Sequence, residues 1–404
     1  MNFLKHAYCR IYQTAFRAAI PFLPYREPAI LHQCEELADI LAKEHIENLM
    51  VVTDAGIVKC GLTEKLCSVL DESHISYCIY DRTAPNPTVK NVEEAFSLYK
   101  EYGCQALIAI GGGSAMDCAK AVGARAAYPN KELGKLKGTL RVLRKIPLLI
   151  AIPTTAGTGS ETTVAAVITD SEKKHKYVLN DFVLIPRYAV LDASLTYSLP
   201  KSLTATTGMD ALTHAVEAYI GRSTTKETRK MALSATRLIF ENIEKAYENG
   251  SDHEARANML KAAYEAGFAF TRSYVGYIHA VAHSLGGQYN VPHGLANAVL
   301  MPYVLDAYGP CVYKKLHEMG CAAGVCSTED SYEEGAHKFI RAIRDLNARM
   351  QIPEHISGIR KEDIPTMAAH AEKEANPLYP VPRLMTKQEL AVFFEVVSEF
   401  ALTN

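Results

Sequence analysis

The stretch ALIAIGGGSAMDCAK, Ala106 to Lys120, joins an apolar run to an amphipathic one through three glycines and a serine. Its first half is typical of a strand and its second half has helical spacing, so it predicts a strand, a glycine loop and a helix. Glycines let a backbone approach an anion, and the N–H groups at a helix start can bind phosphate. Since neither G-x-G-x-x-G nor the P-loop pattern is present, a structural glycine turn explains the loop equally well.

Further apolar runs alternate with amphipathic segments between about residues 30 and 200. Strand and helix in alternation predict a mostly parallel, Rossmann-like sheet with helices on its faces. The segments HKYVLND (175–181) and FVLIPRY (182–188) are expected to add a hairpin or edge. The runs expected to form the main strands cover residues 48–54, 75–81, 104–113, 147–155 and 188–193.

Two other strand ends carry polar groups that suit a nucleotide. Thr154 and Thr155 begin a loop of hydroxyls and glycines, PTTAGTGSE, directly after a strand. Asp54 ends the strand 48–54, where a carboxylate could bind ribose hydroxyls and repel a 2′-phosphate. A simple helix N-cap is the alternative for Asp54. Together with the glycine loop, these features favour a dinucleotide, NAD.

After Pro200 the segments have helical spacing throughout. We therefore expect an N-terminal helical extension over 1–28, an α/β dinucleotide-binding domain over 29–198 and an all-helical metal domain over 199–404. Arg17 and Pro21 interrupt the N-terminal apolar run, which argues against a signal peptide. That segment is expected to be a helix docked on the body or on a second subunit, with membrane-surface association as the alternative.

The composition is that of an ordinary soluble protein: 404 residues, 48% hydrophobic, 22% charged and a formal net charge of -2. Such a charge gives no reason to expect a nucleic-acid partner, and no apolar run is long enough to cross a membrane. The ten cysteines form no C-x-x-C pair, so a reducing cytoplasm is expected.

Acidic and imidazole side chains gather in two of the helical segments. In TTGMDALTHAVEAY, Asp210 and His214 are four residues apart and share a helix face. In YIHAVAHSLGGQYNVPHG, His279, His283 and His293 lie close in sequence. Each segment alone suits a surface pair or a buried structural histidine. Beside a dinucleotide loop, one carboxylate and three imidazoles suit Fe(II) or Zn(II).

Four motifs, GGGSAMDCAK, PTTAGTGSE, GMDALTHAVEAY and HAVAHSLGGQYNVPHGLANAVLMP, resemble in order those of the iron-containing (group III) alcohol dehydrogenase family. The resemblance spans roughly residues 29 to 390. It implies a dehydroquinate-synthase-like architecture, with the active site in the cleft between the two domains, and a homodimer. It also implies hydride transfer between a small alcohol or aldehyde and NAD(H), with a metal polarising the substrate oxygen.

The resemblance also implies residue roles. Asp54 would favour NAD over NADP, Asn86 and Pro87 would border the adenosine side, and His283 would be an active-site histidine that is not a ligand and relays a proton. The pyrophosphate loop would be Gly111, Gly112, Gly113 and Ser114, and the second cofactor loop Thr154 and Thr155. The metal ligands would be Asp210, His214, His279 and His293.

The chain departs from the family pattern at Ser284, where proline is frequent, and at Arg272 and Tyr274, which leaves the substrate open. An Arg272 that faces the pocket would suit an anionic substrate, and a structural arginine is the alternative. A glycerol-dehydrogenase-like or dehydroquinate-synthase-like enzyme would use the same scaffold. A metal-dependent hydrolase would leave the glycine loop and Asp54 unexplained, and the intact ligands and cofactor loops argue against a silent structural subunit.

Overall fold

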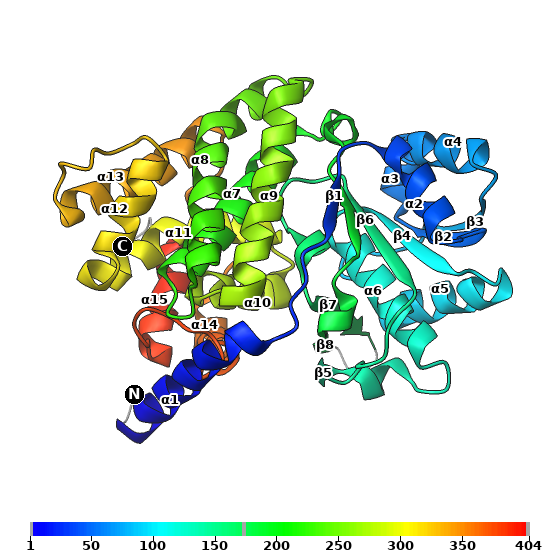
Figure 1. The fold of residues 1–404 in the computed structure, drawn as a ribbon. Coiled ribbons are helices and arrows are strands. Elements are labelled where there is room, and N and C mark those ends of the chain that lie inside the picture. Colours follow the sequence, from blue (N-terminus) through cyan, green and yellow to red (C-terminus); the bar gives the residue numbers. More distant parts are fainter. Residues whose placement is uncertain (1–2, 172–174, 401–404) are drawn as a thin grey trace. The chain divides into compact units, whose positions relative to one another are not determined.

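The computed structural model describes residues 3–171 and 175–400 of the chain (Figure 1). It contains two compact units. Pro24–Leu199 forms one unit, and the other joins the N-terminal segment up to Leu23 to the chain from Pro200 onward. The two are described separately below.

The unit Pro24–Leu199 is built on a six-stranded sheet with the order β1-β9-β6-β4-β2-β3, and all its strand pairs are parallel. This confirms the predicted parallel sheet, although β1 has three residues and was not predicted. The strands are β1 (Ala29–Leu31), β2 (Asn48–Val52), β3 (Ser76–Tyr80), β4 (Ala106–Gly111), β6 (Leu148–Pro153) and β9 (Tyr188–Val190).

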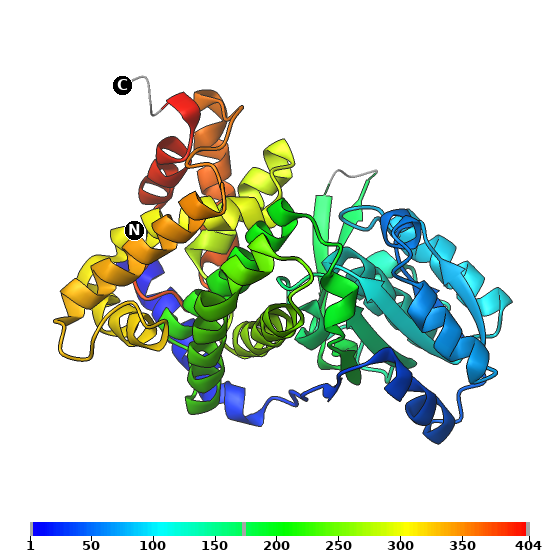
Figure 2. The same ribbon diagram turned by 90° about the horizontal axis from the view of Figure 1, so that it is seen from above.

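Helices cover both faces of this sheet (Figures 1 and 2). Alternate residues of a strand point to opposite faces, so Leu107 packs with the core on the side of α5 and α6, and Ile108 with the core on the side of α2 and α4. Both cores are apolar, as a parallel sheet buried on both faces requires. The helices are α2 (Leu37–Lys43), α3 (Ala55–Lys59), α4 (Glu64–Glu72), α5 (Val89–Glu101) and α6 (Gly113–Ala127).

A second sheet has the order β5-β8-β7, formed by Gly138–Thr139, His175–Asn180 and Ala165–Asp170. The expected hairpin of HKYVLND with FVLIPRY is therefore wrong, because β8 pairs antiparallel with β7, the strand before it. Phe182–Leu184 forms a 3-10 turn instead. The Asp181 side chain begins that turn by accepting a hydrogen bond from Val183 N, and Pro186 has no N–H to continue a ladder.

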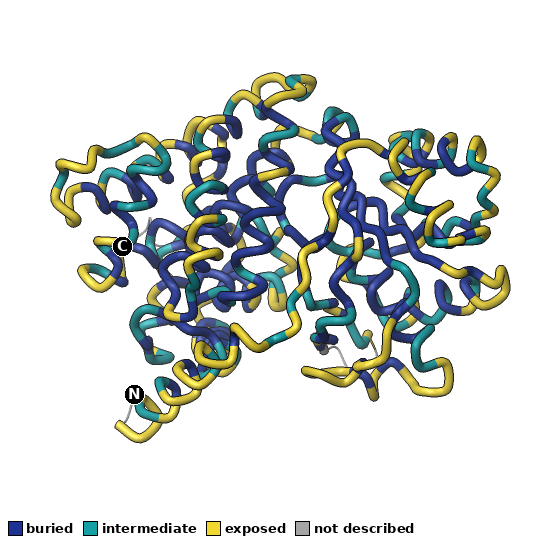
Figure 3. Tube along the Cα trace, viewed as in Figure 1, coloured by how far each residue is buried: buried dark blue, intermediate teal, exposed yellow. Residues whose placement is uncertain are grey.

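The second unit is helical, as the sequence predicts. Thr225, Ser331 and Thr386 cap three of its helices by accepting a hydrogen bond from the backbone three residues later. Helix α7 is buried along Gly208–Ile220 (Figure 3). The helices from Pro200 onward are α7 (Lys201–Ile220), α8 (Lys226–Glu248), α9 (His253–Ser273), α10 (Tyr277–Tyr289), α11 (His293–Tyr308), α12 (Tyr313–Ala322), α13 (Tyr332–Arg349), α14 (Ile364–Ala375) and α15 (Lys387–Val396).

The N-terminal helix α1 (Phe3–Ala19) docks on this helical unit, as its segment was expected to dock on the body. Arg10 donates hydrogen bonds to the carbonyls of Val381 (2.8 Å) and Pro382 (3.0 Å), and Gln13 donates to that of Tyr379 (2.7 Å). In residues 3–171 and 175–400, no helix combines the length and apolar character that a membrane crossing needs.

Candidate metal centre and cofactor loops

The glycine loop lies where β4 meets α6. The strands on either side of β4 bring the other predicted loops to the same end of the sheet. Strand β4 pairs with β2, which ends just before Asp54, and with β6, which leads into Thr154 and Thr155. Thr154 N donates to Gly111 O (3.0 Å), and Thr155 Oγ1 would lie 3.6 Å from a Cβ on Gly112. The three strand-end features thus form one surface.

Two glycines in this loop lie in close contact with their surroundings. Gly111 has φ +147°, and a Cβ there would lie 2.9 Å from Ala115 Cβ. A Cβ on Gly113, the first residue of α6, would lie 3.3 Å from Thr158 Cγ2 in the second loop. The backbone of the α6 start can therefore approach a ligand closely, as a phosphate cradle needs.

Asp54 caps a helix, which was the alternative expected for it, and also lies beside the glycine loop. Its Oδ1 caps α3 by accepting hydrogen bonds from Gly56 N (2.8 Å) and Ile57 N (3.1 Å). Its Oδ2 would lie 3.8 Å from a Cβ on Gly111, so this second oxygen is directed toward the glycine loop. The helix cap fixes the carboxylate and leaves one oxygen beside the loop.

The predicted residue Asn86 also reaches the glycine loop, and Pro87 follows it in the chain. Asn86 has φ +59°, and its N–H donates to Ser114 Oγ (3.3 Å). Lys176 Nζ donates to Asn86 Oδ1 (2.9 Å), and Pro87 O accepts a hydrogen bond from Thr169 N (2.8 Å). Every predicted cofactor residue therefore lies at one end of the sheet.

Lys120 braces the second cofactor loop, a role that the sequence did not reveal. Its buried Nζ donates to Ser160 O (2.7 Å), Thr163 Oγ1 (2.7 Å) and Ala165 O (3.0 Å). Burial lowers the pKa of Lys120 to about 8, against the opposing charges of Asp117 and Glu161. A buried ammonium with several acceptors fixes the loop from behind.

The four predicted metal residues converge in the helical unit. One donor atom from each of Asp210, His214, His279 and His293 lies within 4.8 Å of the others. Asp210 Oδ1 is 3.4 Å from His293 Nε2 and 3.9 Å from His279 Nε2. Donor atoms bound to one tetrahedral cation lie about 3.4 Å apart, so this spacing is close to a bound geometry.

Close backbone contacts set this spacing. A Cβ on Gly294 would lie 2.4 Å from Thr206 O, so the start of α11 rests directly on α7. A Cβ on Gly276 would lie 2.7 Å from Glu217 Oε1, so glycine at the start of α10 leaves room for the Glu217 carboxylate. These two glycines bring three helices together at the cluster.

Glu217 and Asn297 were both missed from the sequence: Glu217 supports His279 from behind, and Asn297 contacts the proposed donor atoms themselves. Glu217 Oε2 is 2.6 Å from His279 Nδ1 and accepts from Gly276 N (2.7 Å), so Nε2 of His279 faces the cluster. Burial raises the pKa of Glu217 to about 7, against these hydrogen bonds. Both residues follow a predicted ligand on the same helix face, three residues after His214 and four after His293.

The hydrogen bonds of Asn297 show that the cluster fits a cation. Its Nδ2 donates to Asp210 Oδ1 (2.7 Å) and lies 3.2 Å from Nε2 of both His279 and His293. Three acceptor atoms from three helices thus point at one amide. Burial, followed by the neighbouring imidazoles, holds the pKa of His279 well below its usual value, which leaves a lone pair for a metal.

Comparison with known proteins identifies the family. The model of the iron-containing alcohol dehydrogenase matches residues 31–193, and that of the family's C-terminal part matches residues 204–396. The chain belongs to the iron-containing alcohol dehydrogenase family. It is thus a metal-dependent, NAD(H)-linked alcohol dehydrogenase or aldehyde reductase.

Individual relatives support this assignment. The chain is 39% identical over 370 residues to alcohol dehydrogenase 4 of Saccharomyces cerevisiae, covering 91% of this chain and 95% of that protein. It is 35% identical over 359 residues to the NAD-dependent methanol dehydrogenase of Bacillus methanolicus, covering 88% and 94%. A crystal structure of 1,3-propanediol oxidoreductase superposes with a TM-score of 0.88 at 35% identity, over 92% of this chain and 97% of that one.

In this family member, His283 is part of a hydrogen-bonded chain beside the metal cluster. Its Nδ1 is 2.6 Å from Glu374 Oε1, which also accepts a hydrogen bond from Tyr379 Oη (2.7 Å). Burial would raise the pKa of Glu374, but the charge and hydrogen bond of His283 and the hydroxyl of Tyr379 hold it below its usual value. The ring centroid of His283 lies 5.1 Å from that of His293.

Arg272 and one open pocket lie outside the metal cluster of this alcohol dehydrogenase. Arg272 is buried on α9, with its guanidinium 3.4 Å from the ring centroid of Phe268, as a structural arginine would be.

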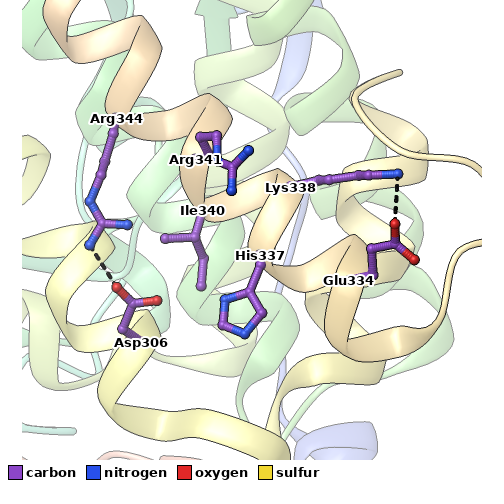
Figure 4. Close-up of a pocket in the computed structure, with 7 residues that line it drawn as sticks. All are labelled: Asp306, Glu334, His337, Lys338, Ile340, Arg341 and Arg344. Atoms are coloured by element: carbon purple, nitrogen blue, oxygen red, sulfur yellow. Dashed lines mark hydrogen bonds and ion pairs between the residues drawn. The ribbon is translucent and has the colours of Figure 1, made fainter.

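The pocket, of about 620 Å³, is lined only by residues of α11 and α13 (Figure 4). Its charges largely pair with one another, as in Arg344–Asp306 (2.6 Å) and Lys338–Glu334 (3.5 Å).

Proposed function

We propose that this enzyme interconverts a small alcohol and its aldehyde or ketone, with Fe(II) held by Asp210, His214, His279 and His293. The observation that carries the proposal is the convergence of these four donor atoms within 4.8 Å. The names of its relatives, a methanol dehydrogenase and a propanediol oxidoreductase, support a small substrate.

When bound, the cation would ease loss of the alcohol proton, and the nicotinamide would accept or return the hydride. The chain's own residues arrange this chemistry. Asp210 supplies the one anionic donor, and Glu217 directs His279 Nε2 into the cluster by binding Nδ1. Asn297 would release these acceptors when the cation binds.

The proposed role of the unit Pro24–Leu199 is to hold NAD(H). Gly111, Gly112, Gly113 and Ser114 would receive the pyrophosphate at the start of α6, where backbone N–H groups are unused by the helix. Asp54 Oδ2 would accept ribose hydroxyls and disfavour a 2′-phosphate. Thr154, Thr155, Asn86 and Pro87 would complete the cofactor surface.

His283 is proposed to relay the substrate proton to solvent. Its side chain is 42% exposed and is hydrogen-bonded to Glu374, so it can pass a proton outward without leaving the cluster. The Glu374 carboxylate would stabilise the imidazolium that forms. Its partner Tyr379 fixes the orientation of that carboxylate.

The choice of Fe(II) over Zn(II), the location and the assembly belong to the same proposal. Mixed nitrogen and oxygen donors suit either metal, and Fe(II) is proposed from the family. Ten cysteines without a disulfide support a cytoplasmic enzyme. The edge strand β1, with Ile30 39% exposed, supports a homodimer, which light scattering of the purified protein would test.

The test combines two measurements on protein purified without oxygen. Iron and zinc are counted per chain, and NADH formation is followed with a panel of small alcohols and diols, with and without added Fe(II). The expected result is about one iron per chain and iron-stimulated NADH formation with at least one alcohol. NADPH formation at the same rate would contradict the role of Asp54, and release of product without any NADH would favour the hydrolase.

A further inference from the structure

A second group of metal-type ligands lies between α12 and α13, apart from the cluster on α7, α10 and α11. His317 and Cys321 are on α12, and Cys326 is in the turn that follows it. One donor atom from each lies within 4.8 Å of the other two. It shares no residue with the proposed active site.

The distances within this group match those around a bound cation. Cys321 Sγ is 3.5 Å from Cys326 Sγ and 3.6 Å from His317 Nε2. Sulfur bound to Zn(II) at about 2.3 Å and nitrogen at about 2.0 Å give S···S near 3.8 Å and S···N near 3.5 Å in a tetrahedron. Small movements of the side chains would therefore complete the coordination.

Two glycines make this arrangement possible. A Cβ on Gly320 would lie 2.8 Å from Cys326 Sγ, and a Cβ on Gly335 would lie 2.2 Å from His317 Cδ2. The turn also contains Gly324, with φ +71°, which folds Cys326 back over α12. Glycine at position 320 thus leaves room for Cys326, and glycine at position 335 leaves room for His317.

The group is sheltered but accessible. His317 is buried, whereas Cys321 and Cys326 are half-buried, so an ion can enter from solvent. Burial, followed by the neighbouring Cys321, raises the pKa of the Cys326 thiol to about 12. A thiol can lose its proton to a metal that binds it.

Another close cysteine pair among the described residues lacks a third ligand. Cys78 and Cys104 have their sulfurs 3.7 Å apart, but both lie in the apolar core beside the sheet. Among the described residues, no histidine or carboxylate joins them to make a metal group. Cysteine proximity alone therefore does not distinguish a ligand set from core packing.

We propose that His317, Cys321 and Cys326 form a second metal site, specific for a thiolate-seeking divalent cation such as Zn(II), with solvent as the fourth ligand. The site ties the end of α12 to the turn before α13. A set of two thiolates and one imidazole is softer than the oxygen and nitrogen set of the first site, so the two sites select different metals.

The binding step is a simple exchange of protons for metal. The cation forms two bonds to sulfur and one to nitrogen, and the two thiols release two protons to solvent without any oxidation. His317 Nε2, which is 2.9 Å from Ser327 O, must carry its ring proton on Nδ1 in the bound form. Binding therefore tightens as pH rises.

Cobalt substitution in the full-length enzyme tests this proposal independently of the first site. Only the second site contains sulfur, so an intense thiolate-to-Co(II) charge-transfer band reports it alone. The expected result is such a band in the unmodified protein, its loss in Cys321→Ser/Cys326→Ser, and its retention in Cys78→Ser/Cys104→Ser. Zinc-loaded protein should hold one zinc fewer in the first double variant. The Asp210→Asn variant should still bind metal at the thiolate site, even if the proposed active-site metal is wrong.

A second measurement needs no variant and so does not depend on folding of the mutants. Alkylation of Cys321 and Cys326 in the unmodified protein, located by peptide mass, should slow when Zn(II) is present and should recover with a chelator. Absence of both the charge-transfer band and zinc protection would overturn the proposal. A Cys321–Cys326 disulfide that persists under reducing, zinc-containing conditions would also overturn it.

Discussion

The metal cluster is built from side chains, whereas the cofactor loops are built mainly from backbone. The cluster uses side chains from three helices, with Glu217 bound to His279 and Asn297 bound to Asp210. The loops use the backbone, with Gly111 and Gly113 allowing close approach and Lys120 bracing the loop opposite. Changes of side-chain chemistry should therefore damage the first region, and changes of backbone shape the second.

The largest effect is expected from Asp210→Asn, which removes the only anionic ligand. Several kcal/mol of transition-state stabilisation would be lost, so kcat/KM should fall by about 10³-fold or more, with loss of bound iron. The control is Asp306→Asn, since Asp306 is on α11 and pairs with Arg344 outside the cluster. Full activity in Asp210→Asn would show that the site does not need the negative charge of Asp210.

The next largest effect is expected from His283→Ala. Loss of a general acid–base group should lower kcat about 10²-fold and alter its pH profile, while iron content stays near that of the unmodified enzyme. His337→Ala, an exposed histidine on α13, is the matched control. Loss of iron in His283→Ala would instead make this residue a ligand or a support for one.

A smaller effect is expected from Glu217→Gln, which keeps the shape but weakens the support of His279. Removal of such a partner lowers metal affinity by about 10–100-fold, as a competition assay with a chelator would measure. Added Fe(II) should restore most of the turnover, which a merely unfolded variant would not do. The control is Glu241→Gln, whose carboxylate pairs with Arg237 on the exposed side of α8.

The smallest effect, and the one that tests the backbone side of the comparison, is expected from Gly111→Ala. Strain at φ +147° and the 2.9 Å contact with Ala115 should cost about 1–3 kcal/mol and displace the loop. The KM for NAD should rise while iron affinity is unchanged. Gly134→Ala, where a Cβ would meet nothing within 4 Å, should behave as the unmodified enzyme.

The sequence predicted much of this arrangement because regular spacing determines which residues share a face. Asp210 with His214 indicated one helix face, and the alternation of strands and helices predicted the sheet that carries the loops. Glu374 could not be predicted from spacing, because it reaches His283 from 91 residues away. The pairing of β8 with β7 was missed because the cap at Asp181, and not strand propensity, decides the conformation of the next residues.

The proposed site at His317 could not be predicted from the sequence for a different reason. Its first two members have the same four-residue spacing as Asp210 and His214, so the signal was present in the sequence. The third member depends on a turn at Gly324 that no periodicity describes. Spacing alone therefore finds the ligands on one helix and misses those that a turn folds back.

The contact between Gly294 and Thr206 has a consequence for engineering metal preference. Coordination distances tolerate changes of only about 0.2 Å, and this contact fixes how far His293 stands from Asp210. An alanine at position 294 would push α11 away from α7 and enlarge the site without altering any donor. Substitution at position 294 is thus a direct route to an enzyme that prefers a larger cation, with all four ligands retained.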